Sequence, residues 1–490
     1  MAILTPEQIK QIVAEIQQDA ETSRRAEMHR RHKIYLDGGK QYLIEQLTRE
    51  FSPDAVKEMR LAPINLLKKI VNKKSSIYKE PPNRKANSEG NQKLVDFYTA
   101  KLSVDQVMMK GNRYYNLSSN CVIYTRPTAH GLCARVVPPY LYSIVPSQAD
   151  QTIIESYVFS DFIEEGRVIP FKDLMPATGS EGFSRSRGTK SKDDEVASDE
   201  IDGSTKRSFI MWTNEQHFTT DESGQKIQLD KESGEEQYDN PIDVMPIVNL
   251  AQDRDNTPWA MQGGDMIDVS LAVQLALSDV LSIAKHQGFS LLSIVSEEEP
   301  RNLKIGLNRA IWLKATEGTP TPKIEYVQAQ SPLDQYKAII LDLVALLLST
   351  NDMSISSIGG SAQTKSITSG FQALIEMSDT LEIIEQQKPI MREAEKKLWE
   401  HISKWHNYLY DEDQLDDESR SLGKFTDDFE IAINYRDIKP IESEQERVGV
   451  VKDLTALKLM TKKDAVKKLN PDLTDEQVDE KLDELKEEYG

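Results

Sequence analysis

The sequence has very little cysteine and none of the motifs that cysteine and histidine form around a metal. Only Cys121 and Cys133 occur in 490 residues, and no Cys-x-x-Cys pair exists. His401 and His406 lie five positions apart, outside the i, i+4 spacing with which a helix binds a metal ion. We therefore expect no metal site and no disulfide framework. Both histidines are interpreted as surface or packing residues.

Long hydrophobic runs are scarce as well. Hydrophobic residues make up 38% of the chain and charged residues 29%. The apolar run 338–348 would span only about 16 Å as a helix, whereas a bilayer requires about 20 residues. The start, Met1-Ala2-Ile3-Leu4, lacks the basic and long apolar regions of a signal peptide. We expect no membrane span, no membrane partner and synthesis in the cytosol.

The chain has fewer basic than acidic residues, with 60 Lys and Arg against 80 Asp and Glu. The formal net charge is −20, and residues 411–490 hold 13 Lys and Arg against 24 Asp and Glu. An acidic chain does not bind nucleic acid by general electrostatic attraction. If DNA is a partner, we expect it to slide past this protein rather than to be held tightly.

Catalytic motifs are nearly absent. No Gly-x-Ser-x-Gly or His-Glu-x-x-His sequence occurs. Residues 359–366 approach the phosphate-binding loop, but Thr364 replaces its second glycine and the preceding segment does not read as a strand. Residues 253–264 begin like a calcium loop, but Pro258 stands where that loop requires glycine. We expect a protein that is not an enzyme, with no catalytic residues and no cofactor.

The most informative stretch is 331–410. An apolar helix, expected to be buried on every side by its own core or by neighbouring copies, is followed by a Ser-, Asn- and Gly-rich loop. A long amphipathic helix follows, and Pro389 should kink it without ending it. Its apolar stripe recurs at spacings of three, four or seven: Phe371, Leu374, Leu381, Ile384, Met391, Leu398, Trp405 and Leu409.

The rest of the chain reads as a mainly helical α+β protein. Thr5 and Gln8 form a capping box before the first helix, and basic helices are expected over 21–36 and 62–78. The five basic residues of the first of these are interpreted as a solvated face, or alternatively as a contact with an acidic partner or a neighbouring subunit: Arg24, Arg25, Arg30, Arg31 and Lys33. Short strands are expected between 120 and 162, at 209–212 and 226–229 as a hairpin, at 246–250 and at 429–435.

From 264 the pattern becomes helical, with an apolar stripe that includes Val269, Val273, Leu277, Val280 and Ile283. A β-rich excursion at 291–330 then returns to the apolar helix. The last eighty residues are expected to end in short helices, with Thr461 and Thr474 as caps.

The order of these pieces resembles the portal proteins of tailed double-stranded DNA phages of the long-tailed type. Four stretches carry the resemblance: 33–38, 65–73 followed by Pro81-Pro82, Ser369-Gly370-Phe371-Gln372-Ala373-Leu374, and the tail 431–488. The resemblance covers most of the chain. It implies a ring, usually of twelve subunits, at one capsid vertex.

The resemblance also implies a division of the chain. The wing would comprise 1–262, with a mobile insertion at 177–207, together with the long helix and strand at 367–436. The stem helices would lie at 263–289 and 331–350, with the small β-rich clip at 290–330 between them. The tunnel loop would be 351–366 and the helical crown 437–490.

The site residues implied by the resemblance fall in two groups. Residues of the tunnel loop would face DNA: Ser357, Gly359, Gly360, Ser361, Gln363, Thr364 and Lys365. Residues of the clip would dock the packaging motor and then the head–tail adaptor: Glu298, Arg301, Lys304, Arg309 and Trp312. The expected partners are further copies of the chain (a dodecamer), the terminase large subunit, the head–tail adaptor, the major capsid and scaffolding proteins, and double-stranded DNA passing without sequence specificity.

The implied function is a channel through which double-stranded DNA is packaged and later ejected. The protein would be assembled in the host cytoplasm and reside in the virion at the portal vertex. Two alternatives stay open: a phosphate-loop ATPase subunit of a packaging motor, in which Lys365 would be essential, and an unrelated cytosolic helical scaffold protein. Assembly state and intrinsic ATPase activity discriminate between them.

Overall fold

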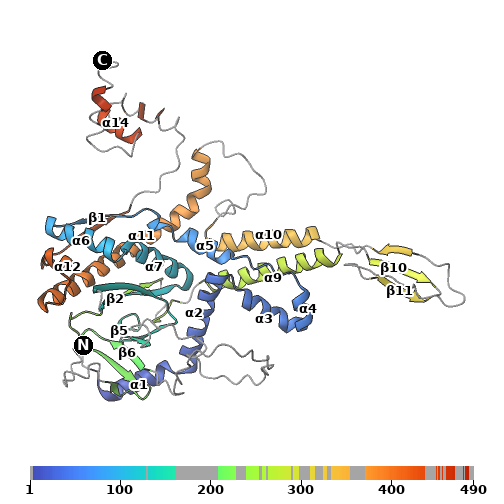
Figure 1. Ribbon diagram of the computed structural model, residues 1–490, viewed down its shortest axis with the longest axis horizontal. Helices are drawn as coiled ribbons and strands as arrows, with labels where there is room; N and C mark the ends of the chain where they lie inside the picture. The colour runs from blue at the N-terminus through green and yellow to red at the C-terminus, as the bar shows by residue number, and fades with distance from the viewer. Residues whose placement is uncertain are drawn as a thin grey trace, which may run out of the picture. The chain divides into compact units, whose positions relative to one another are not determined.

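The computed structural model (Figure 1) describes most of the chain as two compact units. Unit 1 comprises Met1–Leu347 and Ile384–Tyr435, and unit 2 comprises Leu348–Ile383 and Arg436–Gly490. The described residues are 4–128, 131–160, 208–227, 239–252, 257–260, 263–287, 291–296, 310–314, 324–327, 333–353, 370–435, 448–449, 451–452, 455, 460–469, 478 and 481–484. The insertion expected at 177–207 lies outside them.

The N-terminal part of unit 1 is helical. Its helices are α1 (Pro6–Ile16), α2 (Asp19–Asp37), α3 (Lys40–Glu50) and α4 (Pro53–Glu58). The Thr5 side chain accepts from the Gln8 backbone, and the Gln8 side chain accepts from the Thr5 backbone, which confirms the predicted capping box. Gly38 ends α2 at φ +76°, a left-handed conformation that favours glycine.

A second group of elements follows Pro63. The predicted basic helix over 62–78 is shorter than expected, since α5 (Leu66–Lys74) is followed by the 3₁₀ turn η1 (Ile77–Lys79). Asn65 begins α5 by accepting from the Lys68 backbone N–H. Next come β1 (Asn83–Ala86), α6 (Glu89–Lys101) and α7 (Val104–Ser118).

Two of the antiparallel sheets of unit 1 contain the strands between α7 and α9 (Gly264–Gln287). The three-stranded sheet has the order β3-β2-β9, with β2 (Asn120–Thr128), β3 (Gly131–Val137) and β9 (Ile247–Ala251). The five-stranded sheet runs in the order β4 (Tyr142–Pro146), β5 (Ile154–Ser160), β6 (Ser208–Trp212), β7 (His217–Asp221) and β8 (Lys226–Ile227). The predicted hairpin was wrong in one respect: β7, rich in threonine, lies between β6 and β8 and pairs with both.

The chain forms a small sheet after the helix α9 (Gly264–Gln287) and before the helix α10 (Leu333–Thr350). The sheet consists of β10 (Leu291–Ser296), β11 (Ala310–Lys314) and β12 (Ile324–Val327) in the order β11-β10-β12. Leu291 is paired with Val327, so the end of α9 and the start of α10 are tied to the same end of one antiparallel strand pair. The predicted β-rich excursion is confirmed, and Figure 1 draws it beyond the ends of both helices.

The long helix α11 (Gly370–Asp411) continues through Pro389, as predicted. Five residues of the predicted stripe are buried: Ile384, Met391, Leu398, Trp405 and Leu409. α12 (Asp417–Ser421) and β13 (Ile431–Asn434) follow, and β13 pairs antiparallel with β1. The sequence-based expectation of a mainly helical α+β chain is confirmed.

The described elements of unit 2 include the first turns of α11 and the short helix α14 (Lys462–Leu469). The Thr461 hydroxyl accepts from the Asp464 backbone N–H, which confirms Thr461 as a cap. Thr474 lies outside the described residues.

One described helix segment, Gly264–Lys285 within α9, is long and apolar enough to cross a membrane by length and composition alone. Its mean hydropathy is 1.6, and 44% of the window is buried inside the protein. The expectation that no run approaches such a length was wrong, because valine, leucine, isoleucine and alanine keep the average high although polar residues interrupt the apolar run. Buried helices of soluble proteins also meet this criterion.

Candidate functional site: the uncovered faces of α9 and α10

The buried residues of α9 are polar as well as apolar, and the apolar ones are Met266, Ile267, Leu271 and Val273. The buried polar residues of α9 recur every fourth position: Ser270, Gln274, Ser278 and Ser282. The Ser278 hydroxyl accepts from the backbone N–H of Ala62 at 3.0 Å, and that of Ser282 accepts from Arg60 at 3.4 Å. Lys285 donates to the Glu58 carbonyl. Small hydroxyl side chains therefore let an extended segment before α5 lie directly against the helix.

The apolar stripe predicted for α9 is only partly covered. Val273 is buried, whereas Val269, Leu277, Val280 and Ile283 are half-buried. Leu281 is 40% exposed. The other buried apolar residues of α9 lie outside the predicted stripe: Met266, Ile267 and Leu271.

The helix α10 keeps even more apolar surface in contact with solvent. Ile339, Leu341 and Leu346 are 54%, 50% and 63% exposed. The buried residues of α10 are Ile340, Leu347 and Leu348, which lie on one side of the helix. Burial on every side by the chain's own core is therefore contradicted: one chain supplies a partner for one side of α10 only.

These exposed residues define what we call the stem patch: Leu281, Ile339, Leu341 and Leu346. Singly exposed apolar residues are normal, whereas a contiguous exposed apolar patch is typical of a surface that associates with another protein or a membrane. Covering a half-exposed leucine or isoleucine is worth roughly 1 kcal/mol. The patch can therefore contribute several kcal/mol to an association.

Almost all residues predicted to act on DNA or on partners fall outside the description. The tunnel-loop residues Ser357, Gly359, Gly360, Ser361, Gln363, Thr364 and Lys365 lie outside the described residues. So do the clip residues Glu298, Arg301, Lys304 and Arg309. Trp312 lies in β11, where its backbone is paired with Ile294 of β10. The phosphate-loop alternative at 359–366 remains a prediction for the same reason.

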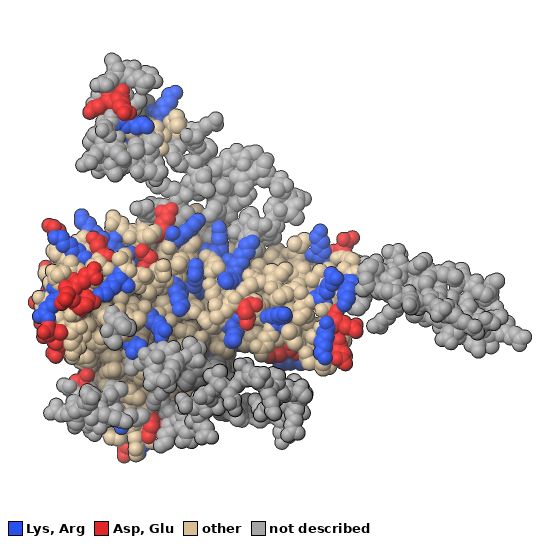
Figure 2. Space-filling view, in the orientation of Figure 1, with Lys and Arg blue, Asp and Glu red and all other residues tan. Residues whose placement is uncertain are grey.

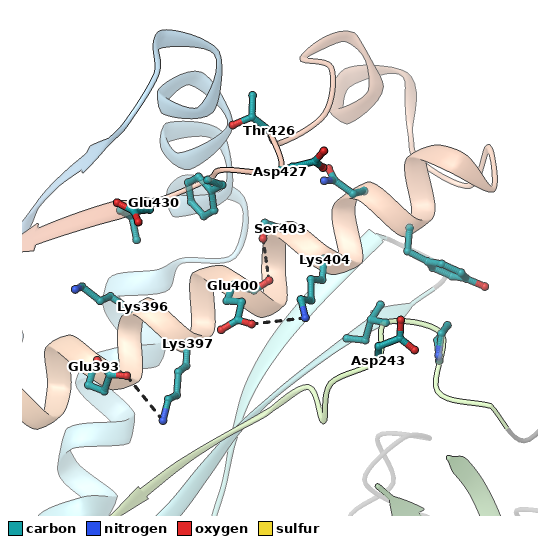
Figure 3. Close-up of a pocket in the computed structure, with 16 residues that line it drawn as sticks. Asp243, Glu393, Lys396, Lys397, Glu400, Ser403, Lys404, Thr426, Asp427 and Glu430 are labelled. Atoms are coloured by element: carbon teal, nitrogen blue, oxygen red, sulfur yellow. Dashed lines mark hydrogen bonds and ion pairs between the residues drawn. The ribbon is translucent and has the colours of Figure 1, made fainter. Parts of the chain in front are cut away.

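A groove of about 850 Å³ runs along the outer face of α11 (Figure 3). Its walls come from α11, the loop at 241–243 and the segment 426–431. Lys397 lies 3.9 Å from Glu393, and Lys404 lies 3.6 Å from Glu400. Figure 3 shows these pairs along one side of the helix. Among the lining residues there is no histidine or cysteine, so the groove holds no evident nucleophile–base pair.

A buried ionic cluster, which the sequence analysis missed, joins α11 to the N-terminal half of unit 1. Glu395 Oε1 pairs with Arg84 Nε, and Arg84 also reaches Asp105 at 2.7 Å. Tyr78 donates to Glu395 Oε2 and lies 2.7 Å from the Tyr435 hydroxyl. Burial raises the pKa of Glu395, against the lowering effect of Arg84 and Tyr78. The cluster holds β1, η1, α7, α11 and the end of β13 together.

The arginines of α2 are not simply a solvated face. Arg24 and Arg31 are buried. Arg24 donates to the carbonyls of Pro139 and Tyr142, pairs with Glu21 and lies 3.5 Å from the centre of the Trp259 ring. The interpretation as a solvated face was therefore wrong for Arg24 and Arg31, because both are buried and their acidic partners belong to the same chain.

Both predicted packing histidines are buried. His406 lies 2.8 Å from the Tyr98 hydroxyl and 2.8 Å from the Gly423 carbonyl oxygen, which fixes its ring between α6 and the segment after α12. Cys121 and Cys133 are free. Within the part of the chain that the structure describes, no group of three or more His, Cys, Asp or Glu side chains is arranged to bind a metal ion.

Comparison with known proteins identifies no relative: no family model and no curated protein matches this chain.

Proposed function

We propose that this chain is a portal protein: a subunit of a ring at a phage capsid vertex through which double-stranded DNA is packaged and ejected. The single observation that carries the proposal is the stem patch. Two helices lead into a small sheet and return from it, and both keep leucine or isoleucine in contact with water. Neighbouring copies that place their helices side by side would remove this surface from water.

A ring also agrees with the asymmetry of the patch. Its residues lie on two different helices, so α9 of one copy can contact α10 of the next, and such a contact is heterologous when it is not reciprocated. Heterologous contacts repeat around an axis and close into a ring when the rotation permits. The wing, stem, clip, crown and tunnel-loop assignments, the partners and the location in the virion belong to this proposal.

The first experiment tests assembly. Native mass spectrometry and negative-stain imaging of the full chain should give a closed ring with a central channel. The double variant Leu341→Lys, Leu346→Lys should stay monomeric, because two ammonium groups would have to be buried in the interface. Ile153→Lys is the matched control, since Ile153 is 48% exposed but lies beside β5, outside the stem patch.

Two results would count against the proposal. One is a wild-type protein and a double variant with the same monomeric state at every concentration. The other is a ring that both lysine variants form equally well, since the stem patch would then not be the interface.

A second experiment concerns the proposed tunnel loop. Deletion of residues 359–365 should leave ring assembly intact and reduce the amount of DNA packaged in a reconstituted reaction. Loss of the ring itself would contradict a channel role. An intrinsic ATPase activity abolished by Lys365→Ala would instead favour the phosphate-loop alternative.

A further inference from the structure

The segment 62–79 carries the densest positive charge without a neighbouring carboxylate in its own sequence. It contains Lys68, Lys69, Lys73, Lys74 and Lys79 and not one aspartate or glutamate. The whole chain has a net charge of −20, so five lysines in eighteen residues depart sharply from the composition around them. Such a segment attracts polyanions even on an acidic protein.

The fold turns these lysines outward on a fixed helix. Leu67, Ile70 and Val71 of α5 are buried, and α5 contacts α2, α7 and α9. Lys68, Lys69 and Lys79 are exposed, and Lys73 is half-buried. These four residues make up what we call the α5 lysine face.

Two side-chain contacts hold α5 in place. The Asn65 amide donates to the carbonyls of Ile34 and Tyr35 at the end of α2. The Tyr35 hydroxyl donates to Asn72 Oδ1 at 2.9 Å. The backbone that carries the lysines is therefore docked from both ends of the helix, and only the lysine side chains remain free to adapt.

The four residues of the α5 lysine face have no carboxylate partner among the described residues. Several lysines elsewhere in unit 1 are ion-paired, including Lys101 with Asp416, Lys397 with Glu393 and Lys404 with Glu400. Lys68, Lys69, Lys73 and Lys79 form no such pair within the described parts of the chain. Figure 2 shows Lys and Arg side chains gathered where Figure 1 draws α5. Their charge is available to an external anion.

Neighbouring elements add positive potential. Burial is the main cause that lowers the pKa of His32 on α2 to about 4, and Lys110 of α7 and Lys33 of α2 lower it further. Arg113 of α7 lowers the pKa of Tyr35 against the raising effect of burial, so it lies close to the residue that contacts Asn72. The cations of α2 and α7 thus lie on the elements that pack against α5.

We propose that the α5 lysine face binds the phosphate backbone of double-stranded DNA without reading its sequence. The choice of DNA as the polyanion rests on the proposed function. Lys68 and Lys73 are five residues apart, about 7.5 Å along the helix axis. The phosphates of one strand advance about 3.4 Å per residue, so two lysines can reach phosphates about two steps apart.

The residue types favour a duplex backbone over other polyanions. Single-stranded nucleic acid is usually held by exposed aromatic rings on which bases stack, and Tyr78, the one aromatic residue of 62–79, is buried. Arginine would supply the planar fork that fixes a carboxylate or phosphate in one geometry, whereas lysine is a flexible point charge. Four lysines and no arginine therefore fit weak contacts that a sliding duplex can exchange.

The test measures the salt dependence of DNA binding by the full chain. Fluorescence anisotropy with a short labelled duplex would be recorded over a range from about 50 to 200 mM salt. Removing three phosphate contacts in Lys68→Gln, Lys69→Gln, Lys73→Gln should make the slope of log K against log[salt] shallower by about 2.7. Two duplexes of unrelated sequence should show the same loss.

Two variants serve as controls. Lys93→Gln, Lys397→Gln, Lys404→Gln removes the same charge from lysines that pair with Glu89, Glu393 and Glu400, and it should leave the slope within experimental error of wild type. Lys68→Arg, Lys69→Arg, Lys73→Arg keeps the charge and should keep the slope. All six lysines are on the surface or half-buried, so thermal unfolding should be nearly unchanged.

Two outcomes would overturn the inference: no binding of the wild-type chain to duplex DNA at low salt, or an equal slope for the glutamine and control variants. Failure here is distinct from failure of the ring proposal. If the chain forms a ring and its DNA binding does not depend on the α5 lysine face, the proposed function stands and this inference is wrong. If the chain is a monomer that binds duplex DNA through α5, this inference stands and the ring proposal is wrong.

Discussion

The hydroxyl of Tyr78 donates to Oε2 of Glu395 across 2.6 Å, and the Glu395 side chain has no exposed surface. The other carboxylate oxygen pairs with Arg84, whose side chain is 6% exposed. A buried ion pair contributes little by itself, but removal of one partner leaves the other charge buried and uncompensated. The cluster is therefore a point at which a single substitution weakens the whole of unit 1.

Arg84→Met should lower the free energy of unfolding by about 3–5 kcal/mol, because Glu395 would lose its only cationic partner among the described residues. The measurement is urea denaturation followed by tryptophan fluorescence. Lys85→Met is the control, since Lys85 is the exposed neighbour on the same strand. A loss no larger in Arg84→Met than in Lys85→Met would contradict the prediction.

The histidines predict sensitivity to acid. Burial is the first cause that lowers the pKa of five of them: to about 4 for His29, His32 and His217, to about 3 for His401, and downward for His406. As the pH falls below 6.5, the unfolded chain binds protons that the folded chain does not bind. Each well-buried histidine should therefore reduce stability by up to about 1.4 kcal/mol per pH unit.

The measurement is urea denaturation at several pH values between 7.5 and 5. His401→Gln should give a shallower fall than wild type, because its buried position no longer takes a proton on unfolding. Glu395 has a raised pKa, so its protonation changes stability in the opposite direction. Because Glu395 is present in both proteins, the difference between their stabilities at each pH reports on His401. If the stabilities of wild type and His401→Gln fall equally with pH, His401 takes up protons in the folded protein as readily as in the unfolded chain.

Asp416 predicts a smaller and local effect. Its Oδ1 accepts from the Ser419 backbone N–H at 2.8 Å, and its other oxygen pairs with Lys101. Hydrogen bonding from Lys101 and Ser419 lowers the pKa of Asp416 to about 2, so this support is complete above pH 3.8 and disappears only as the pH falls through about 2. Asp416→Ala should cost about 1 kcal/mol at neutral pH, the usual cost of a lost helix cap.

Hydrogen exchange is the measurement for Asp416, because α12 should lose protection while α7 does not. Asp417→Ala is the control, since Asp417 lies one residue further on and is exposed. Equal protection of α12 in both variants would show that the cap does not stabilise it.

Helices with a periodic apolar stripe could be predicted from the sequence. The residues that pack against those helices could not. The α11 stripe was correct at Ile384, Met391 and Leu398 because one face of the helix is buried where its side chains are described. Glu395 lies four positions after Met391 and three before Leu398, so the same periodicity places it on the buried face. Its partner Arg84 lies more than three hundred residues away, and no local pattern connects the two.

The stem helices show the limit most clearly. Apolar composition indicates that α10 needs partners, but it does not indicate whether one chain provides them. The buried residues of α9 include Ser270, Gln274, Ser278 and Ser282, which a hydrophobicity scale assigns to the surface. Serine can face a backbone because its hydroxyl satisfies the N–H groups of that backbone, and this use of serine depends on a segment distant in sequence.

Ser278 gives the last prediction, which tests the polar side of α9 directly. Its hydroxyl donates to the Gln274 carbonyl and accepts from the Ala62 N–H at 3.0 Å, and its side chain is fully buried. Ser278→Ala should leave the Ala62 N–H without a partner and cost about 1–3 kcal/mol. Ser421→Ala is the control, because that exposed hydroxyl bonds only to the nearby Glu418 carbonyl. Urea denaturation measures both. If the two variants are equally stable, water or a shifted backbone replaces the lost acceptor. Ser278 would then matter because its small side chain lets the segment before α5 approach the helix, and its hydrogen bond to that segment would add no stability.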